Sequence, residues 1–111
     1  MKPTVKVADL PPLDKEGFLY QPSQWTPEVA ELLAEQAGIR LTEAHWEIIR
    51  VLRRFYQDYD LAPAMRLLVK TVKAELGEEK GNSIYLMQLF PGSPAKLSAR
   101  LAGLPKPANC L

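Results

Sequence analysis

Apolar residues in the middle of the chain recur at intervals of three and four positions, the spacing that lines one face of an α-helix. The segment over 42–59 shows this pattern most fully, and Thr42 stands at its start as a helix-capping residue. Its recurring apolar residues are Trp46, Ile49, Leu52, Phe55 and Tyr56. The pattern predicts a long helix that forms the central element of the core.

Four more helices are predicted from the same spacing and from residues that start and stop helices. They cover about 27–37, 63–76, 83–90 and 94–102. Proline suits the first helical position because its missing N–H is not needed there, and glycine suits the position after the last because it accepts a left-handed backbone. The residues concerned are Thr26, Pro27, Gly38, Gly77, Asn82, Pro91, Ser93, Pro94 and Gly103.

The N-terminal segment predicts a short β-hairpin. Val5 and Val7 alternate with polar neighbours, which is the period of a strand, and turn-forming residues over 11–17 precede the apolar residues of 18–20. A chain of 111 residues buries only one modest core. The expected fold is therefore mainly α, with a minor β contribution, in a single domain over residues 1–103.

Residues 104–111 are predicted to form an extended, mobile C-terminal arm. Pro105 and Pro107 exclude helix and bias the residues before them toward extended geometry. At about 3.1 Å per residue, such an arm reaches on the order of 25 Å. It carries Cys110, so we expect the thiol to travel freely about the body.

The charge of the chain is close to balanced, with fourteen basic and thirteen acidic residues and a formal net charge of +1. No long-range field therefore favours nucleic acid or an anionic membrane over a protein partner. No apolar run approaches the roughly 20 residues of a membrane-spanning helix, and the first residues lack the apolar stretch of a signal peptide. We expect a cytoplasmic protein without membrane contact.

Cys110 is the only cysteine, and it precedes Leu111 at the end of the arm. One cysteine forms no internal disulfide, and with His45 as the only histidine neither a metal site nor another cofactor is expected. A free thiol on a mobile arm suits a sulfur carrier, because a persulfide forms when a thiolate attacks the sulfur of a donor. The alternative is an incidental cysteine in an unstructured tail.

Several basic residues are candidates for partner binding. Arg66, Lys70 and Lys73 fall on one face of the third predicted helix, where they either dock a partner or form an ordinary solvated surface. Lys106, in the arm next to the cysteine, is a further candidate.

Two other groups of residues point to different chemistry. Arg50, Arg53 and Arg54 suggest a DNA-binding helix, but the small net charge and neighbouring carboxylates argue against that role. His45 is a candidate base for Cys110, although its place in the first turn of the long helix is more typical of a hydrogen-bonding residue.

Several blocks of sequence, spread over nearly the whole chain, form a recognisable set. They are Asp14-Lys15-Glu16-Gly17-Phe18-Leu19, Ser23-Gln24-Trp25, His45-Trp46-Glu47, Pro63-Ala64-Met65-Arg66, Gly77-Glu78-Glu79-Lys80-Gly81-Asn82-Ser83, Leu89-Phe90-Pro91-Gly92-Ser93-Pro94-Ala95-Lys96 and Ala102-Gly103-Leu104-Pro105-Lys106-Pro107. With these blocks the chain resembles the DsrC/TusE family of sulfur-relay proteins, and within it the TusE-like members with a single C-terminal cysteine.

The resemblance implies an orthogonal bundle of about five helices, with an N-terminal hairpin and an active cysteine at the end of the arm. It implies a sulfurtransferase in which Cys110 accepts persulfide sulfur from a TusBCD-like donor and passes it to an MnmA-like tRNA 2-thiouridylase. The tRNA, thiolated at its wobble uridine, is then only an indirect partner.

The alternatives are a DsrC-like non-catalytic partner subunit of a sulfite reductase or other sulfur enzyme, and a DNA-binding regulator. DsrC proper carries a second cysteine at the position of Ala99, which favours the single-cysteine relay for this chain.

Overall fold

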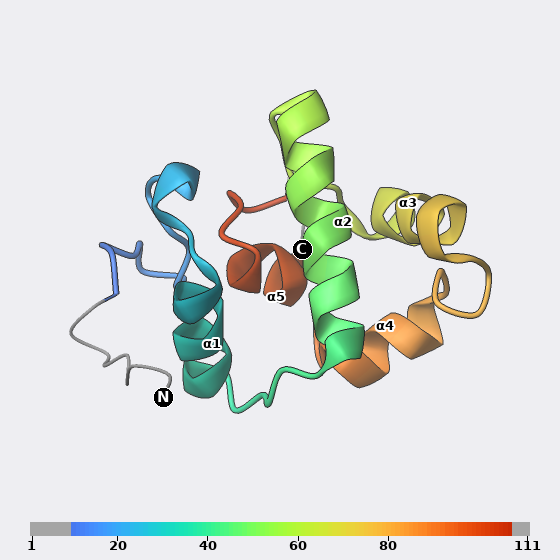
Figure 1. The fold of residues 1–111 in the computed structure, drawn as a ribbon, viewed down its shortest axis with the longest axis horizontal. Coiled ribbons are helices and arrows are strands. Elements are labelled where there is room, and N and C mark those ends of the chain that lie inside the picture. The colour runs from blue at the N-terminus through green and yellow to red at the C-terminus, as the bar shows by residue number, and fades with distance from the viewer. Residues whose placement is uncertain (1–9, 108–111) are drawn as a thin grey trace.

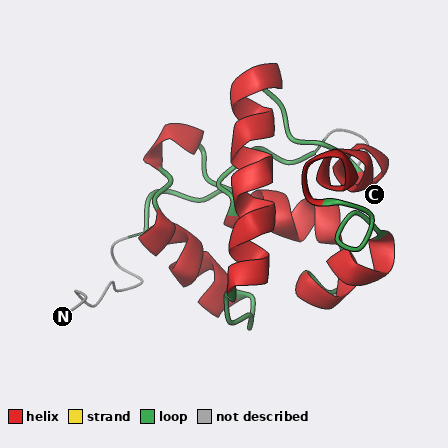
Figure 2. Cartoon of the chain, turned by 45° about the vertical axis from the view of Figure 1, so that its right-hand side comes forward, coloured by secondary structure: helices red, strands yellow, loops and turns green. Residues whose placement is uncertain are grey.

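Five α-helices make up most of residues 10–107, the part of the chain that the computed structural model describes (Figure 1). They are α1 (Pro27–Gln36), α2 (Glu43–Tyr59), α3 (Met65–Leu76), α4 (Ser83–Leu89) and α5 (Pro94–Leu101), preceded by a 3₁₀ turn, η2 (Pro22–Gln24). The prediction of a mainly helical chain of about five helices is confirmed. Both α3 and α4 run across the direction of α2, in keeping with an orthogonal bundle (Figures 1 and 2).

Local capping chemistry explains why the helices begin where they do. The Thr26 hydroxyl accepts a hydrogen bond of 3.1 Å from the backbone N–H of Val29, and the Asn82 side chain accepts one of 2.8 Å from Tyr85. The largest difference from the predicted bounds is at α3, expected from Pro63. Because Ala64 has an extended backbone with ψ 171°, the helix starts at Met65 instead.

The long helix α2 places one apolar face in the core, as its spacing predicts. Ile48, Ile49 and Leu52 are fully or almost fully buried, and Phe55 is buried beside them. Trp46 and Tyr56 are partly buried and pack against the same core. This face contacts α3 and α5.

The short helix α5 lies at the centre of the bundle, where it contacts the other four helices (Figure 1). Its buried residues are small, and Ala95, Ser98 and Ala99 allow the neighbouring backbones to approach closely. The residues that follow α5 therefore start from the middle of the core.

The first strand of the predicted hairpin lies outside the described residues. The turn that follows it is present: Asp14 Oδ1 accepts hydrogen bonds of 2.9 Å from the backbone N–H groups of Glu16 and Phe18. One antiparallel β-bridge joins Leu13 to Leu19 across this turn. Phe18 and Leu19 are buried, so the turn is anchored in the core.

Residues 104–107, which the sequence assigns to a mobile arm, pack against the body. Leu104 belongs to the core and is fully buried, and Pro107 is also buried. The remaining four residues of the predicted arm, with Cys110, lie outside the described residues, so the mobility of that segment stays a prediction. Within residues 10–107 no helix combines the length and the apolar character needed to cross a membrane.

Candidate functional site

The segment that leads toward Cys110 leaves α5 through a tight turn at Gly103, whose φ is +74°. The Gly103 N–H donates to the carbonyl of Arg100 at 3.1 Å, and the Leu104 N–H donates to the carbonyl of Ala99 at 2.9 Å. These bonds occupy carbonyls that the end of a helix would otherwise leave free. We call residues 103–107 the arm root, and its first turn fixes the direction in which the chain leaves the body.

Two side chains from distant parts of the sequence hold the end of α5, from which the arm root departs. Trp25 Nε1 donates to the carbonyl of Leu101 at 2.9 Å, and the Arg53 guanidinium donates to the carbonyl of Ala102 at 3.0 Å. The Arg53 guanidinium carbon also lies 4.3 Å from the centre of the Trp25 ring, a cation–π contact. Burial lowers the pKa of Arg53, yet an arginine side chain stays charged at neutral pH.

Gly103 lies directly against the indole of Trp25. A Cβ atom at position 103 would be 2.5 Å from Trp25 Cδ1, closer than real Cβ atoms approach a neighbour. Glycine is therefore required here twice, for its left-handed backbone and for the close approach of Trp25.

An ion pair joins the arm root to the N-terminal turn. Lys106 Nζ lies 3.1 Å from Glu16 Oε1, and Lys96 Nζ, from α5, lies 3.2 Å from the same oxygen. The hydrogen bonds from Lys106 and then Lys96 lower the pKa of Glu16 below its usual value of 4.5. Glu16 is thus a carboxylate at neutral pH, and it contacts both lysines.

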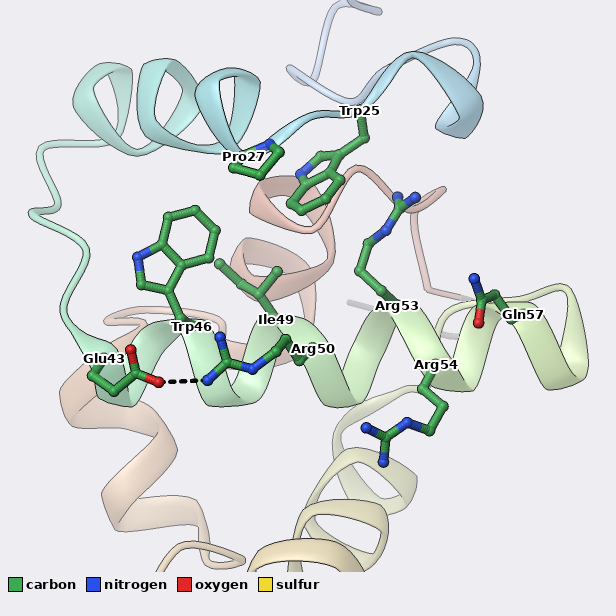
Figure 3. A pocket seen from close by; sticks show the side chains of 9 residues that line it. All are labelled: Trp25, Pro27, Glu43, Trp46, Ile49, Arg50, Arg53, Arg54 and Gln57. Atoms are coloured by element: carbon green, nitrogen blue, oxygen red, sulfur yellow. Dashed lines mark hydrogen bonds and ion pairs between the residues drawn. The ribbon is translucent and has the colours of Figure 1, made fainter. Parts of the chain in front are cut away.

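A cleft of about 600 Å³ lies beside these residues, between the start of α1 and the outer face of α2 (Figure 3). Trp25, Trp46 and Ile49 give it an apolar floor, and arginines stand around it. Its one carboxylate, Glu43, pairs with Arg50. Within residues 10–107 no three His, Cys, Asp or Glu side chains gather to hold a metal ion. The cleft therefore combines an apolar floor with mostly basic surroundings.

Comparison with known proteins decides the family. A sequence model described as "DsrC like protein" matches residues 8–111, nearly the whole chain. The chain belongs to the DsrC-like family. Within that family, the protein "Sulfurtransferase TusE" of Pectobacterium atrosepticum is 51% identical over 98 residues, which are 88% of this chain and 90% of that protein.

Two solved structures of DsrC proteins share the fold. The NMR structure of Allochromatium vinosum DsrC is 52% identical, has a TM-score of 0.81, and covers 89% of this chain and 88% of its own. The crystal structure of the oxidized gamma-subunit of dissimilatory sulfite reductase from Archaeoglobus fulgidus is 46% identical, with a TM-score of 0.77 and coverage of 90% and 91%. The resemblance drawn from the sequence blocks is therefore confirmed.

The predicted basic residues of this DsrC-like chain fall in two places. Arg66, Lys70 and Lys73 lie exposed on α3, and Lys73 Nζ is 3.6 Å from a carboxylate oxygen of Glu78. Lys106 belongs to the arm root and pairs with Glu16. Partner binding by these residues, and the reactivity of Cys110, which lies outside the described residues, stay predictions.

The three arginines of α2 have separate partners within the fold. Arg50 pairs with Glu43, Arg54 pairs with Glu75 of α3, and Arg53 donates to the carbonyl of Ala102 at the end of α5. Sequence spacing alone suggests one basic group, because it does not reveal these contacts. The role of Arg53 beside Trp25 was not predicted, and only the carbonyls at the end of α5 explain it.

His45 has a structural role in the DsrC-like fold. It is buried, with Nδ1 accepting from the Thr42 N–H at 3.1 Å and Nε2 lying 2.8 Å from the carbonyl of Leu89. Nε2 therefore carries the proton and donates to Leu89, and the imidazole joins the start of α2 to the end of α4. The interpretation of His45 as a hydrogen-bonding residue at a helix end is confirmed.

Trp25→Phe should separate the hydrogen bond of Trp25 from its packing. Loss of the donor leaves the buried carbonyl of Leu101 with one partner fewer, so we expect the free energy of unfolding to fall by about 1–2 kcal/mol in urea titrations. Trp46→Phe is the matched control, because no hydrogen bond of the Trp46 indole is present within residues 10–107. Equal losses in the two variants would contradict a role for the Leu101 bond.

Proposed function

We propose that this chain is a sulfur carrier of the sulfurtransferase type, in which Cys110 holds sulfur as a persulfide. The observation that carries the proposal is the 51% identity to a sulfurtransferase TusE over 88% of the chain. The proposed donor is a TusBCD-like complex, and the proposed acceptor is an MnmA-like tRNA 2-thiouridylase that modifies the wobble uridine. The proposed compartment is the cytoplasm, where thiols remain reduced.

The proposed reaction needs one thiol and no external oxidant. The Cys110 thiolate attacks the terminal sulfur of a donor persulfide, so that a new S–S bond forms at Cys110 while the donor S–S bond breaks and the donor leaves as a thiolate. In the second step a thiolate of the acceptor attacks the terminal sulfur on Cys110. Cys110 is then the leaving thiolate and is ready for another cycle.

The fold supports this proposal by giving the thiol a fixed point of departure. Pro107 is buried against the body, and Cys110 is three residues further along the chain. Three residues span at most about 10 Å, so the thiol has less reach than the 25 Å expected for a free arm of eight residues. A partner that takes Cys110 into its reaction pocket must therefore come close to the arm root.

A second candidate function is that of a protein subunit of a sulfite reductase, favoured by the likeness to the A. fulgidus gamma-subunit. Ala99 weighs against DsrC-type chemistry in this chain. It stands at the position of the second cysteine implied by the resemblance, and it is fully buried in α5. Without a second thiol the chain forms no intramolecular disulfide.

Persulfide loading tests the proposal directly. Incubation of the reduced protein with a small polysulfide donor should add sulfur to the chain, as seen by intact-protein mass spectrometry, and a dithiol reductant should remove it. Because the chain has one cysteine, prior alkylation with iodoacetamide blocks that thiol alone and is the control. A protein that never gains sulfur under these conditions would rule out the carrier function.

A further inference from the structure

Three cationic side chains gather around a single carboxylate at the arm root. Lys96 and Arg100 lie four residues apart on α5, Lys106 follows in the arm root, and Glu16 contacts both lysines at 3.2 and 3.1 Å. We call these four residues the root cluster. It has a local excess of two positive charges in a chain whose overall charge is nearly zero.

Arg100 is held in place without an acidic partner. Its side chain packs on Gly17, where a Cβ atom would lie 3.2 Å from Arg100 Cδ and 3.3 Å from Nε. Nε is buried and has no hydrogen-bond partner, and within residues 10–107 no carboxylate pairs with the guanidinium. Packing thus fixes a cation that has no ion-pair partner among the described residues.

The root cluster borders a surface hollow of about 530 Å³. Glu16, Lys96 and Arg100 line it, together with Gln36 at the end of α1 and Pro91 before α5. The hollow is open to solvent, and mostly polar groups face it. A side chain of another protein therefore has both room and charged groups to meet there.

We propose that the root cluster is the docking site for an acidic segment of the partner protein that receives Cys110. The inference rests on the proposed carrier function, because only a partner that takes up the thiol is forced to lie against the arm root. A carboxylate of that segment pairs with Lys96 or Arg100 in the hollow, or with Lys106, which reaches the hollow's rim through its ion pair with Glu16. Glu16 holds the lysines until the partner arrives and competes with it afterwards.

Charge distribution favours an acidic protein over nucleic acid as the occupant. The three cations of the root cluster lie within one small area, whereas a phosphate backbone is bound by basic residues spread along a face or groove.

Two substitutions in the root cluster should change partner binding in opposite directions. Glu16→Gln keeps the shape of the side chain but removes the competing charge, so the affinity for the partner should rise, by about three- to tenfold. Lys96→Glu should lower it by roughly tenfold or more and flatten its dependence on salt. The measurement is calorimetric titration with the proposed donor complex and with the proposed tRNA 2-thiouridylase, at two salt concentrations.

Matched variants elsewhere on the surface control for a general effect of charge. Glu79→Gln and Arg40→Gln alter exposed side chains outside the root cluster and should leave affinity unchanged. If the root cluster only ties the arm root to the body, Glu16→Gln weakens binding or leaves it as it was, and the proposal is overturned. Failure of the wild-type protein to bind either partner overturns it as well.

Loading with the polysulfide donor separates this proposal from the carrier function, because that reaction needs no docking. Normal loading with no effect of the root-cluster variants on binding rejects the docking site and leaves the carrier standing. Absence of loading rejects the carrier. A parallel titration with unmodified tRNA should show no binding. If tRNA instead binds in a salt-dependent way, Lys96→Glu weakens that binding and neither partner protein binds, then the cluster is a nucleic-acid site.

Discussion

Cys110→Ser is expected to abolish sulfur relay while leaving the body of the protein intact. A serine hydroxyl is not ionised at neutral pH, and its oxygen cannot form the S–S bond of a persulfide. In a reconstituted relay, the rate of 2-thiouridine formation in tRNA should fall on the order of a thousandfold or more, as when an enzyme loses its nucleophile. Nucleoside analysis of digested tRNA by mass spectrometry measures the product.

The control for Cys110→Ser is partner binding. The root cluster and the arm root are unchanged in this variant, so its affinity for the donor complex and the thiolase should match that of the wild-type protein. Full 2-thiolation by Cys110→Ser would contradict the carrier proposal and favour the role of a non-catalytic subunit. Loss of binding together with loss of relay would show that the substitution acts through recognition instead of chemistry.

Gly103→Ala is expected to destabilise the fold more than any other single methyl addition at the arm root. A left-handed backbone costs a non-glycine residue about 1–2 kcal/mol, and overpacking against Trp25 adds about 1–3 kcal/mol. The free energy of unfolding should therefore fall by about 2–5 kcal/mol, and Tm by roughly 10–30 °C for a domain of this size. Thermal unfolding followed by circular dichroism measures both.

Gly38→Ala is the matched control for this substitution. Gly38 also has φ +74°, but among the described residues other than its chain neighbours no heavy atom lies within 4 Å of the position that its Cβ would take. Its replacement should cost only the backbone contribution, about 1–2 kcal/mol. The difference between the two variants isolates the contact of Gly103 with Trp25, and equal losses would mean that the indole moves aside without strain.

The expected loss of stability in Gly103→Ala matters for function because α5 and the arm root are one structural unit. α5 contacts every other helix, and Leu104 continues the core beyond the end of α5. Strain at Gly103 therefore lowers the stability of the bundle and also changes the direction in which the arm leaves it. A Gly103→Ala protein that still folds at low temperature should bind partners less tightly even with its root cluster intact.

Much of the helical structure is determined by the sequence itself, because the signals that start and stop a helix act within a few residues. The Thr26 bond to Val29 and the Asn82 bond to Tyr85 each span three positions, and spacing along the chain reveals them. The family resemblance likewise rests on short contiguous blocks. The proposed chemistry of Cys110 also comes from the sequence, since it depends on the identity of one residue.

Only the tertiary structure decides how the arm root is held. Trp25 meets Leu101 across 76 residues of sequence, and Glu16 meets Lys106 across 90. Both contacts depend on how several apolar faces pack around α5, and no local pattern encodes that arrangement. For the same reason the sequence suggests a free arm from residue 104, because prolines exclude helix but do not show that Leu104 fills a place in the core.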